Sequence, residues 1–186
     1  MRQRLILTLP ADLAAARLSS ALAVGDIAAV VLPASAGEGP ALVAAAQAAG
    51  AAALVSGTGW PAPFGADGLH VEGDVAKRLA ARPDGAMCGV VADERHRAMV
   101  AGEAGADYLW FDATGDLVTG CALANWWQAL FEVPAVVAGS SDETTLAALI
   151  GTRAEFVALV DVFGERHDEV TRVAAINRAL GDAGAR

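Results

Sequence analysis

Carboxylates stand directly after several short apolar runs of this 186-residue chain. Glu72 follows GLHV, Asp112 follows YLWF, and Asp161 follows FVALV. If these runs are strands of one parallel barrel, their carboxyl ends meet at a single rim, where the three side chains can converge. Oxygen ligands of this kind suit a hard cation such as Mg²⁺. The alternative, three carboxylates that are merely solvated at the rim, stays open.

Other acidic residues near the same rim have a simpler role. Asp74, Asp93, Asp142 and Asp168 each stand where a helix is expected to begin, and an aspartate there accepts hydrogen bonds from free backbone N–H groups. For Asp93 and Asp142 we favour the capping role over a chemical one. His70 lies inside an apolar run, where a buried core histidine is favoured over a ligand-binding one.

The elements that must position these residues are eight short apolar runs alternating with Ala-rich helical segments. Most runs lack an in-out alternation, which is typical of parallel strands covered on both faces. The expected strands are residues 5–9, 27–32, 52–55, 68–71, 87–91, 108–111, 135–138 and 156–160. The expected helices are residues 11–23, 40–49, 74–81, 93–104, 142–150 and 168–180, the last a plain amphipathic outer helix.

Two connections are unusual. Residues 56–67 read SGTGWPAPFGAD, which is too rich in Gly and Pro for a full helix and predicts one turn or an irregular crossover. Residues 112–134 read DATGDLVTGCALANWWQALFEVP and predict a Gly/Thr-rich loop followed by a short helix at 125–131. Trp126 and Trp127 in that helix are expected to serve packing or a dimer interface.

The pattern predicts an α/β fold, a compact (β/α)8 TIM barrel with a reduced third helix, as a single domain over residues 1–186. A doubly wound open sheet usually has a glycine-rich first turn, and LTLPADLAAA has none. The tripeptide Gly-Ala-Asp recurs at 65–67 and 105–107, each time ahead of an apolar run. We interpret it as the loop that returns the chain from helix to strand, with Gly105 in the left-handed position after its helix.

Composition narrows the class of partner. The net charge of −9, from 22 acidic against 13 basic residues, argues against nucleic acid or an anionic membrane surface. No apolar run approaches the ~20 residues that span a bilayer, and MRQRLILTLP lacks the features of a signal peptide. We therefore expect a cytoplasmic protein whose two cysteines, Cys88 and Cys121, are reduced, buried thiols.

Two stretches in the middle of the chain carry a family resemblance. Residues 65–73 read GADGLHVEG and residues 89–108 read GVVADERHRAMVAGEAGADY. They resemble the fourth strand and fifth unit of the thiamine phosphate synthase (thiamine-phosphate pyrophosphorylase) family and its thiazole tautomerase relatives, of which this chain looks like a divergent member. The resemblance implies a (β/α)8 barrel, commonly a homodimer. It also implies a magnesium-dependent transferase of thiamine biosynthesis, which joins a hydroxymethylpyrimidine diphosphate to a thiazole phosphate and releases pyrophosphate.

The resemblance also implies where a phosphorylated small molecule would bind. Ser56 stands at the end of the third strand, His70 matches a family histidine, and Thr114 lies in the sixth loop. Gly139 and Ser140 follow the seventh strand, where backbone amides of the family hold a phosphate. Asp161, after the eighth strand, is the last ligand-binding candidate.

The resemblance also implies a magnesium ligand after the fourth strand. Glu72 or Asp74 takes the position of a family magnesium ligand, and Asp112 is the third candidate. No residue is assigned a catalytic role.

Several positions depart from the family pattern. The second strand ends in VVLPASAGEG without a cation, Ser56 and Gly57 replace an Asn-Asp pair, and DATGDLVTG has no lysine. Asp161 replaces a small serine-containing turn, and a carboxylate 4 Å from a phosphate is repelled by about 4 kcal/mol per charge pair at an effective dielectric of 20. These departures favour an alternative, a catalytically impaired or repurposed member that binds another small molecule or a protein partner.

Overall fold

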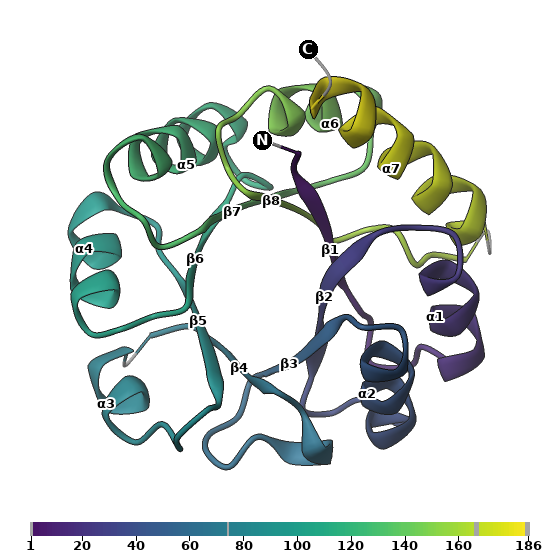
Figure 1. Ribbon diagram of the computed structural model, residues 1–186, viewed down its shortest axis with the longest axis horizontal. Coiled ribbons are helices and arrows are strands. Elements are labelled where there is room, and N and C mark those ends of the chain that lie inside the picture. The colour runs from purple at the N-terminus through teal and green to yellow at the C-terminus, as the bar shows by residue number, and fades with distance from the viewer. Residues whose placement is uncertain (1, 74, 166–167, 185–186) are drawn as a thin grey trace.

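The chain forms a closed barrel in a computed structural model that describes residues 2–73, 75–165 and 168–184. Eight parallel strands pair in chain order, and β8 pairs with β1 to close the ring, as Figure 1 shows in the view down the barrel. Helices surround the strands on the outside (Figure 1). The (β/α)8 TIM barrel predicted from the sequence is confirmed.

Each element keeps its predicted order. The strands are β1 (Arg4–Thr8), β2 (Ile27–Pro33), β3 (Ala52–Ser56), β4 (Gly68–Val71), β5 (Met87–Val91), β6 (Tyr108–Asp112), β7 (Ala135–Gly139) and β8 (Phe156–Leu159). The helices are α1 (Ala15–Leu22), α2 (Gly39–Ala48), α3 (Val75–Ala80), α4 (Arg95–Glu103), α5 (Leu117–Leu130), α6 (Glu143–Ile150) and α7 (Glu169–Gly184). The third connection contains only the 3₁₀ turn η1 (Pro63–Gly65), as its Gly and Pro content predicts. No helix of the described residues combines the length and apolar character needed to cross a membrane.

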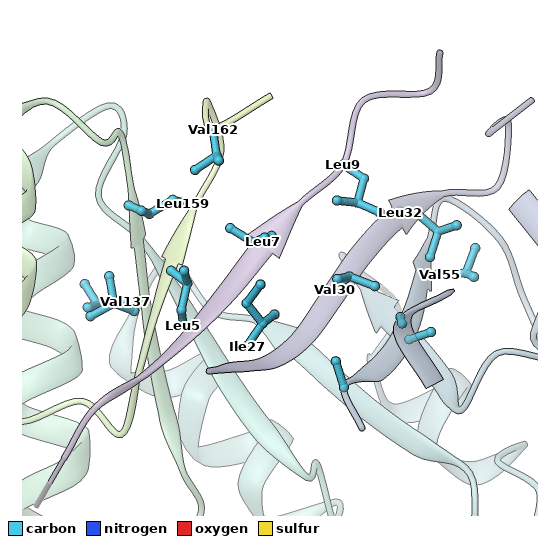
Figure 2. Close-up of a cluster of buried hydrophobic side chains, with 14 of the residues drawn as sticks. Leu5, Leu7, Leu9, Ile27, Val30, Leu32, Val55, Val137, Leu159 and Val162 are labelled. Atoms are coloured by element: carbon cyan, nitrogen blue, oxygen red, sulfur yellow. The ribbon is translucent and has the colours of Figure 1, made fainter. Parts of the chain in front are cut away.

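Two apolar layers hold the barrel together. Outward strand residues such as Leu5, Val30 and Leu159 pack with helix residues in the larger cluster, and Figure 2 shows this layer beside β1 and β2. The smaller cluster contains strand residues only, so it fills the barrel interior; its members are Ile6, Ala29, Val31, Leu54, Tyr108, Trp110, Val136, Ala138 and Ala158. Because both faces of each strand are buried, the strands read as continuous apolar runs.

The repeated Gly-Ala-Asp tripeptide has the structural role expected of it. Gly65 and Gly105 have φ values of 73° and 89°, which favour glycine. The following aspartates tie the loop to a neighbouring strand: Asp67 accepts the N–H of Ala53 at 2.7 Å, and Asp107 accepts the N–H of Cys88 at 2.6 Å. The tripeptide therefore returns the chain from one segment to the next strand.

The sixth connection differs from the expectation of a loop and a short helix at 125–131. Helix α5 begins at Leu117, because Asp116 accepts the Thr119 N–H at 3.1 Å and its hydroxyl at 2.7 Å. Gly120 permits close packing of this first turn, since a Cβ there would lie 2.6 Å from the Ala113 Cβ. The Gly/Thr-rich sequence thus forms helix through a cap and a close contact that helix propensity does not predict.

Two further expectations need correction. Asp93 does not cap a helix: Glu94 holds the N-cap position of α4 without a side-chain hydrogen bond, and Asp93 lies 3.3 Å from Arg97 in an ion pair. Cys88 is buried but Cys121 is only half-buried, and both are free cysteines. Asp142, in contrast, caps α6 as expected by accepting the Thr145 N–H at 3.0 Å.

Gly89 of β5 determines how the barrel interior is filled. A Cβ at this position would lie 1.7 Å from Cζ of Tyr108, the neighbouring residue on β6. Tyr108 is buried, so its ring has little freedom to move aside. The absence of a side chain at Gly89 is therefore what lets the Tyr108 ring lie across β5 toward β4.

We expect Gly89→Ala to lower the free energy of unfolding by about 1–3 kcal/mol, because the added methyl overpacks the interior against Tyr108. Urea unfolding followed by circular dichroism measures the change. Gly115→Ala is the matched control, since nothing lies within 4 Å of a Cβ there. Equal stability of the two variants would contradict this packing.

Candidate functional site

A cavity opens at the carboxyl ends of β3 and β4. It has a volume of about 340 Å³, and most of the residues that line it have polar or charged side chains: Ser56, Gly57, Thr58, His70, Val71, Glu72 and Arg78. Three of the residues expected to bind a ligand or metal, Ser56, His70 and Glu72, are thus brought together here. In TIM-barrel enzymes this end of the strands carries the chemistry.

Arg78 supplies the cation that the strand ends lack. It belongs to α3, and one of its Nη1–H groups donates to the carbonyl of Thr58 across the cavity wall. Its own carbonyl accepts the indole N–H of Trp60 at 2.7 Å, which ties α3 to the β3–β4 connection. Among the described residues Arg78 has no ion-pair partner, so its charge and remaining N–H donors are available to an anion.

The sequence contains a signal for Arg78 that a survey of strand ends misses. Lys77 and Arg78 lie within the helix that follows GLHVEGD, and a long side chain on such a helix can reach back over the rim. A survey that includes basic residues in the first turns of the outer helices would have found it. Of this pair, only Arg78 lines the cavity.

His70 connects the cavity to the barrel interior. Its Nδ1 lies 2.9 Å from the Tyr108 hydroxyl, and its ring meets Trp110 edge-on at a centroid distance of 4.7 Å. Burial lowers the pKa of His70 to about 4, and burial also raises the pKa of Tyr108. Both groups are therefore neutral at pH 7.

The Tyr108 hydroxyl selects the tautomer of His70. A neutral imidazole carries one N–H. If Nδ1 carried it and donated to Tyr108, the buried hydroxyl proton would be left without an acceptor among the described residues, and such a loss is costly. Tyr108 therefore donates to Nδ1, and Nε2–H is the donor that His70 offers to the cavity it lines.

A second group of polar residues lies at the ends of β7 and β8, across the ring from β3 and β4 (Figure 1). Gly139 is buried at the end of β7, and the Ser140 hydroxyl donates to Asp142. Hydrogen bonds from Ser140 and Thr145 lower the pKa of Asp142 to about 2. Asp161 accepts the N–H of Ser141 at 2.8 Å. The structure therefore places Gly139, Ser140 and Asp161 together, but apart from the β3–β4 cavity.

The remaining expected residues lie elsewhere on the rim. Asp112 is exposed at the end of β6, and its Oδ1 accepts the N–H of Thr114 at 2.8 Å. Asp74 lies outside the described residues. Within the described part of the chain, no three His, Cys, Asp or Glu side chains gather as a metal-binding group. The convergence of Glu72, Asp112 and Asp161 stays a prediction without such support.

Thr8 contributes a buried polar atom that the strand-end pattern does not predict. Thr8 ends β1, and its Oγ1 is buried without a hydrogen-bond partner in the described residues. Thr8 lies on the same face of β1 as Ile6, which belongs to the interior cluster. Its hydroxyl is thus an unsatisfied group near the mouth end of the barrel interior.

Comparison with known families agrees with the resemblance. Residues 11–163 match the model of a family described as thiamine monophosphate synthase. The chain belongs to this family. The thiamine-phosphate synthase of Rhodospirillum centenum is 38% identical over 128 residues, covering 62% of each protein. That of Hyphomonas neptunium is 33% identical over 133 residues, covering 65% of this chain and 60% of the relative. The matched part is thus less than two thirds of these relatives' length.

Solved structures share the barrel across several activities. Thiamine phosphate pyrophosphorylase from Pyrococcus furiosus has a TM-score of 0.78 at 15% identity, over 98% of this chain and 96% of its own. Orotidine 5′-monophosphate decarboxylase from Methanocaldococcus jannaschii has a TM-score of 0.63 at 12% identity, over 97% and 99%. At these identities the likeness shows the fold alone, and the site must carry any functional argument.

The buried His70 gives a pH dependence of stability. Burial lowers the pKa of His70 from 6.5 to about 4 in the folded chain. As the pH falls from about 6.5 to about 4, His70 therefore binds a proton in the unfolded chain but stays neutral in the folded chain. Its contribution is present in full above pH 6.5 and falls by up to about 1.4 kcal/mol per pH unit below it. We expect the stability difference between the wild type and His70→Gln, measured by urea unfolding, to shift against the wild type from pH 7.5 to pH 5. A pH-independent difference would contradict the buried, neutral state.

The tautomer gives a second measurement. In ¹⁵N NMR at pH 7, we expect His70 Nε2 to have the shift of a protonated nitrogen and Nδ1 that of an unprotonated acceptor. Tyr108→Phe removes the donor, so the two shifts should move toward the values of a mixed population. A protonated Nδ1 in the wild type would overturn the assignment.

Proposed function

We propose that this chain is a thiamine phosphate synthase, which joins a hydroxymethylpyrimidine diphosphate to a thiazole phosphate and releases pyrophosphate. The observation that carries the proposal is the Arg78 guanidinium, which lines the β3–β4 cavity without an ion-pair partner in the described residues. Family membership over residues 11–163 supports the reaction class. The match covers less than two thirds of the length of the thiamine-phosphate synthase relatives, so the activity is stated as a proposal.

The cavity groups suit a diphosphate leaving group. Negative charge builds up on the departing pyrophosphate, and fixed cations and N–H donors at that point lower the barrier. Arg78 offers a charged fork of donors, and Ser56 and Thr58 bring hydroxyl groups to the same cavity. His70 adds a neutral Nε2–H. In this arrangement the chain binds and stabilises the departing pyrophosphate. The bond to pyrophosphate breaks, and the bond that joins the pyrimidine to the thiazole forms, within the two bound substrates.

Magnesium is the cation that the family resemblance implies, and the described residues fit it only in part. Glu72 lines the cavity, and Mg²⁺ is commonly held by one or two carboxylates together with substrate phosphates. We propose Glu72 as one ligand, with Asp74 and Asp112 as further candidates. When bound, the ion would neutralise charge on the diphosphate. The proposed ligand-binding residues remain Ser56, His70, Thr114, Gly139, Ser140 and Asp161.

The second candidate function is a repurposed member with altered ligand chemistry. One observation favours it: Asp161 places a carboxylate on the Ser141 N–H, where the first candidate requires a phosphate. Such a protein would use the same mouth for another small molecule or a protein partner.

We also propose a cytoplasmic homodimer. Val118 and Leu130 on α5 are 79% and 66% exposed, which is unusual for large apolar side chains and suits a contact with a second copy. Trp127 is not available for that contact, since it is buried and stacks on Phe131 at 4.0 Å. The free thiols Cys88 and Cys121 are typical of a reducing compartment.

The two candidate functions are separated by one assay. Purified protein is incubated with both substrates and Mg²⁺, and thiamine phosphate is measured by chromatography. The first candidate predicts product that disappears when Mg²⁺ is chelated. No product, together with no binding of either substrate by calorimetry, would contradict it and favour the repurposed member.

We expect Arg78→Gln to weaken pyrophosphate binding about tenfold or more, because a hydrogen bond to a charged group contributes roughly 1.5–3 kcal/mol. Isothermal titration calorimetry with pyrophosphate and Mg²⁺ measures the change in Kd. Lys77→Gln is the matched control, because it removes the same charge from the neighbouring helix position outside the cavity lining. If both variants weaken binding equally, Arg78 has no specific role.

A further inference from the structure

The turn after β7 contains hydrogen-bond donors of the kind that bind an anion, but side-chain carboxylates of the protein accept hydrogen bonds from them. The Ser141 N–H donates to Asp161 Oδ1 at 2.8 Å. The adjacent Asp142 accepts the Ser140 hydroxyl and the Thr145 N–H, so the first turn of α6 already has its own carboxylate. Two side-chain carboxylates therefore accept from three donors at the end of β7: the Ser141 N–H, the Ser140 hydroxyl and the Thr145 N–H.

A cation completes the arrangement. Arg172 of α7 donates to the Ser141 hydroxyl, and its Nη1 donates to the carbonyls of Asp161 and Val162 at 2.9 and 3.1 Å. Its Nη2 lies 3.5 Å from Asp161 Oδ2, and Asp168 lies 3.9 Å from Nη1. A guanidinium and a backbone N–H thus converge on one carboxylate, as they would on an oxyanion of a ligand.

We infer that Asp161 is a built-in anion that occupies the anion-binding groups of Ser141 and Arg172, so that this side of the mouth accepts a neutral or cationic part of the ligand. A phosphate placed here would have to displace Asp161 and lie beside Asp142. The opposite side, at β3 and β4, has Arg78 without an ion-pair partner in the described residues. The two sides of the barrel mouth therefore differ: the β3–β4 side favours an anionic group of the ligand, and the β7–β8 side disfavours one.

The inference deepens the second candidate function: it rests on that candidate's ligand entering the mouth and states which end of the ligand carries charge. A thiazole phosphate held at the β7–β8 side, as the first candidate requires, would contradict it. The inference does not depend on turnover. Inorganic phosphate is a sufficient probe, and the Ser141 amide is a local reporter. A protein that forms no thiamine phosphate can still obey the inference, and an active one can violate it.

The experiment is a phosphate titration of the full chain, followed by the ¹H–¹⁵N shift of the Ser141 amide. For the wild type we expect no saturation at this amide. Asp161→Ala frees Ser141 and Arg172, so we expect this variant to bind phosphate saturably. Its Kd should be at least tenfold lower than the lower limit that the titration sets on the wild-type Kd. Adding Arg172→Gln should abolish the gain. If circular dichroism shows that the Asp161→Ala variant is unfolded, Asp161→Ser tests the same expectation.

Asp168→Ala is the matched control. It removes a carboxylate that also lies near Arg172 but does not touch the turn, so its expected gain in phosphate affinity is less than twofold. Equal gains from Asp161→Ala and Asp168→Ala would mean that net charge alone governs binding, and would overturn the inference. So would saturable phosphate binding at Ser141 in the wild type, or a folded Asp161 variant that gains nothing.

Discussion

The passage of the Tyr108 ring over Gly89 is the contact on which the site depends. Because β5 has no side chain at that point, the Tyr108 hydroxyl can reach β4 and donate a hydrogen bond to Nδ1 of His70. That hydrogen bond fixes the tautomer of a histidine that burial keeps neutral, at the edge of the cavity where Arg78 lies. Packing inside the barrel thus decides which donor is presented at its mouth, and the fold and the chemistry cannot be altered separately here.

The mouth has two ends of different electrostatic character. At β3 and β4, Arg78 lines a cavity without a carboxylate partner in the described chain. At β7 and β8, Arg172 and the Ser141 N–H are already engaged by Asp161. Strands that lie across the ring from one another therefore present opposite requirements to a ligand (Figure 1). This polarity favours a ligand with one anionic end, as in the second candidate function, over the two phosphorylated substrates of the first.

Eight apolar runs alternating with helical segments, together with the lack of a glycine-rich first turn, were sufficient to predict the barrel. The start of α5 was not predictable, because it depends on the Asp116 cap and on the close approach of Gly120 to Ala113, which helix propensity does not reveal. The cations do not lie at strand ends: a survey of basic residues on the outer helices would have found Arg78, whereas the segment containing Arg172 reads as a plain amphipathic helix. Their reach to the rim is a tertiary property, whereas Ser56, His70 and Glu72 follow from strand ends alone.

The polarity of the mouth is the central claim, and a crystal structure of the full chain soaked with pyrophosphate and Mg²⁺ tests it most directly. We predict the diphosphate in the β3–β4 cavity, with its oxygens within hydrogen-bond distance of the Arg78 guanidinium and the Asp161–Ser141 contact unchanged. A diphosphate bound instead at Ser141 and Arg172, with Asp161 displaced, would contradict the account.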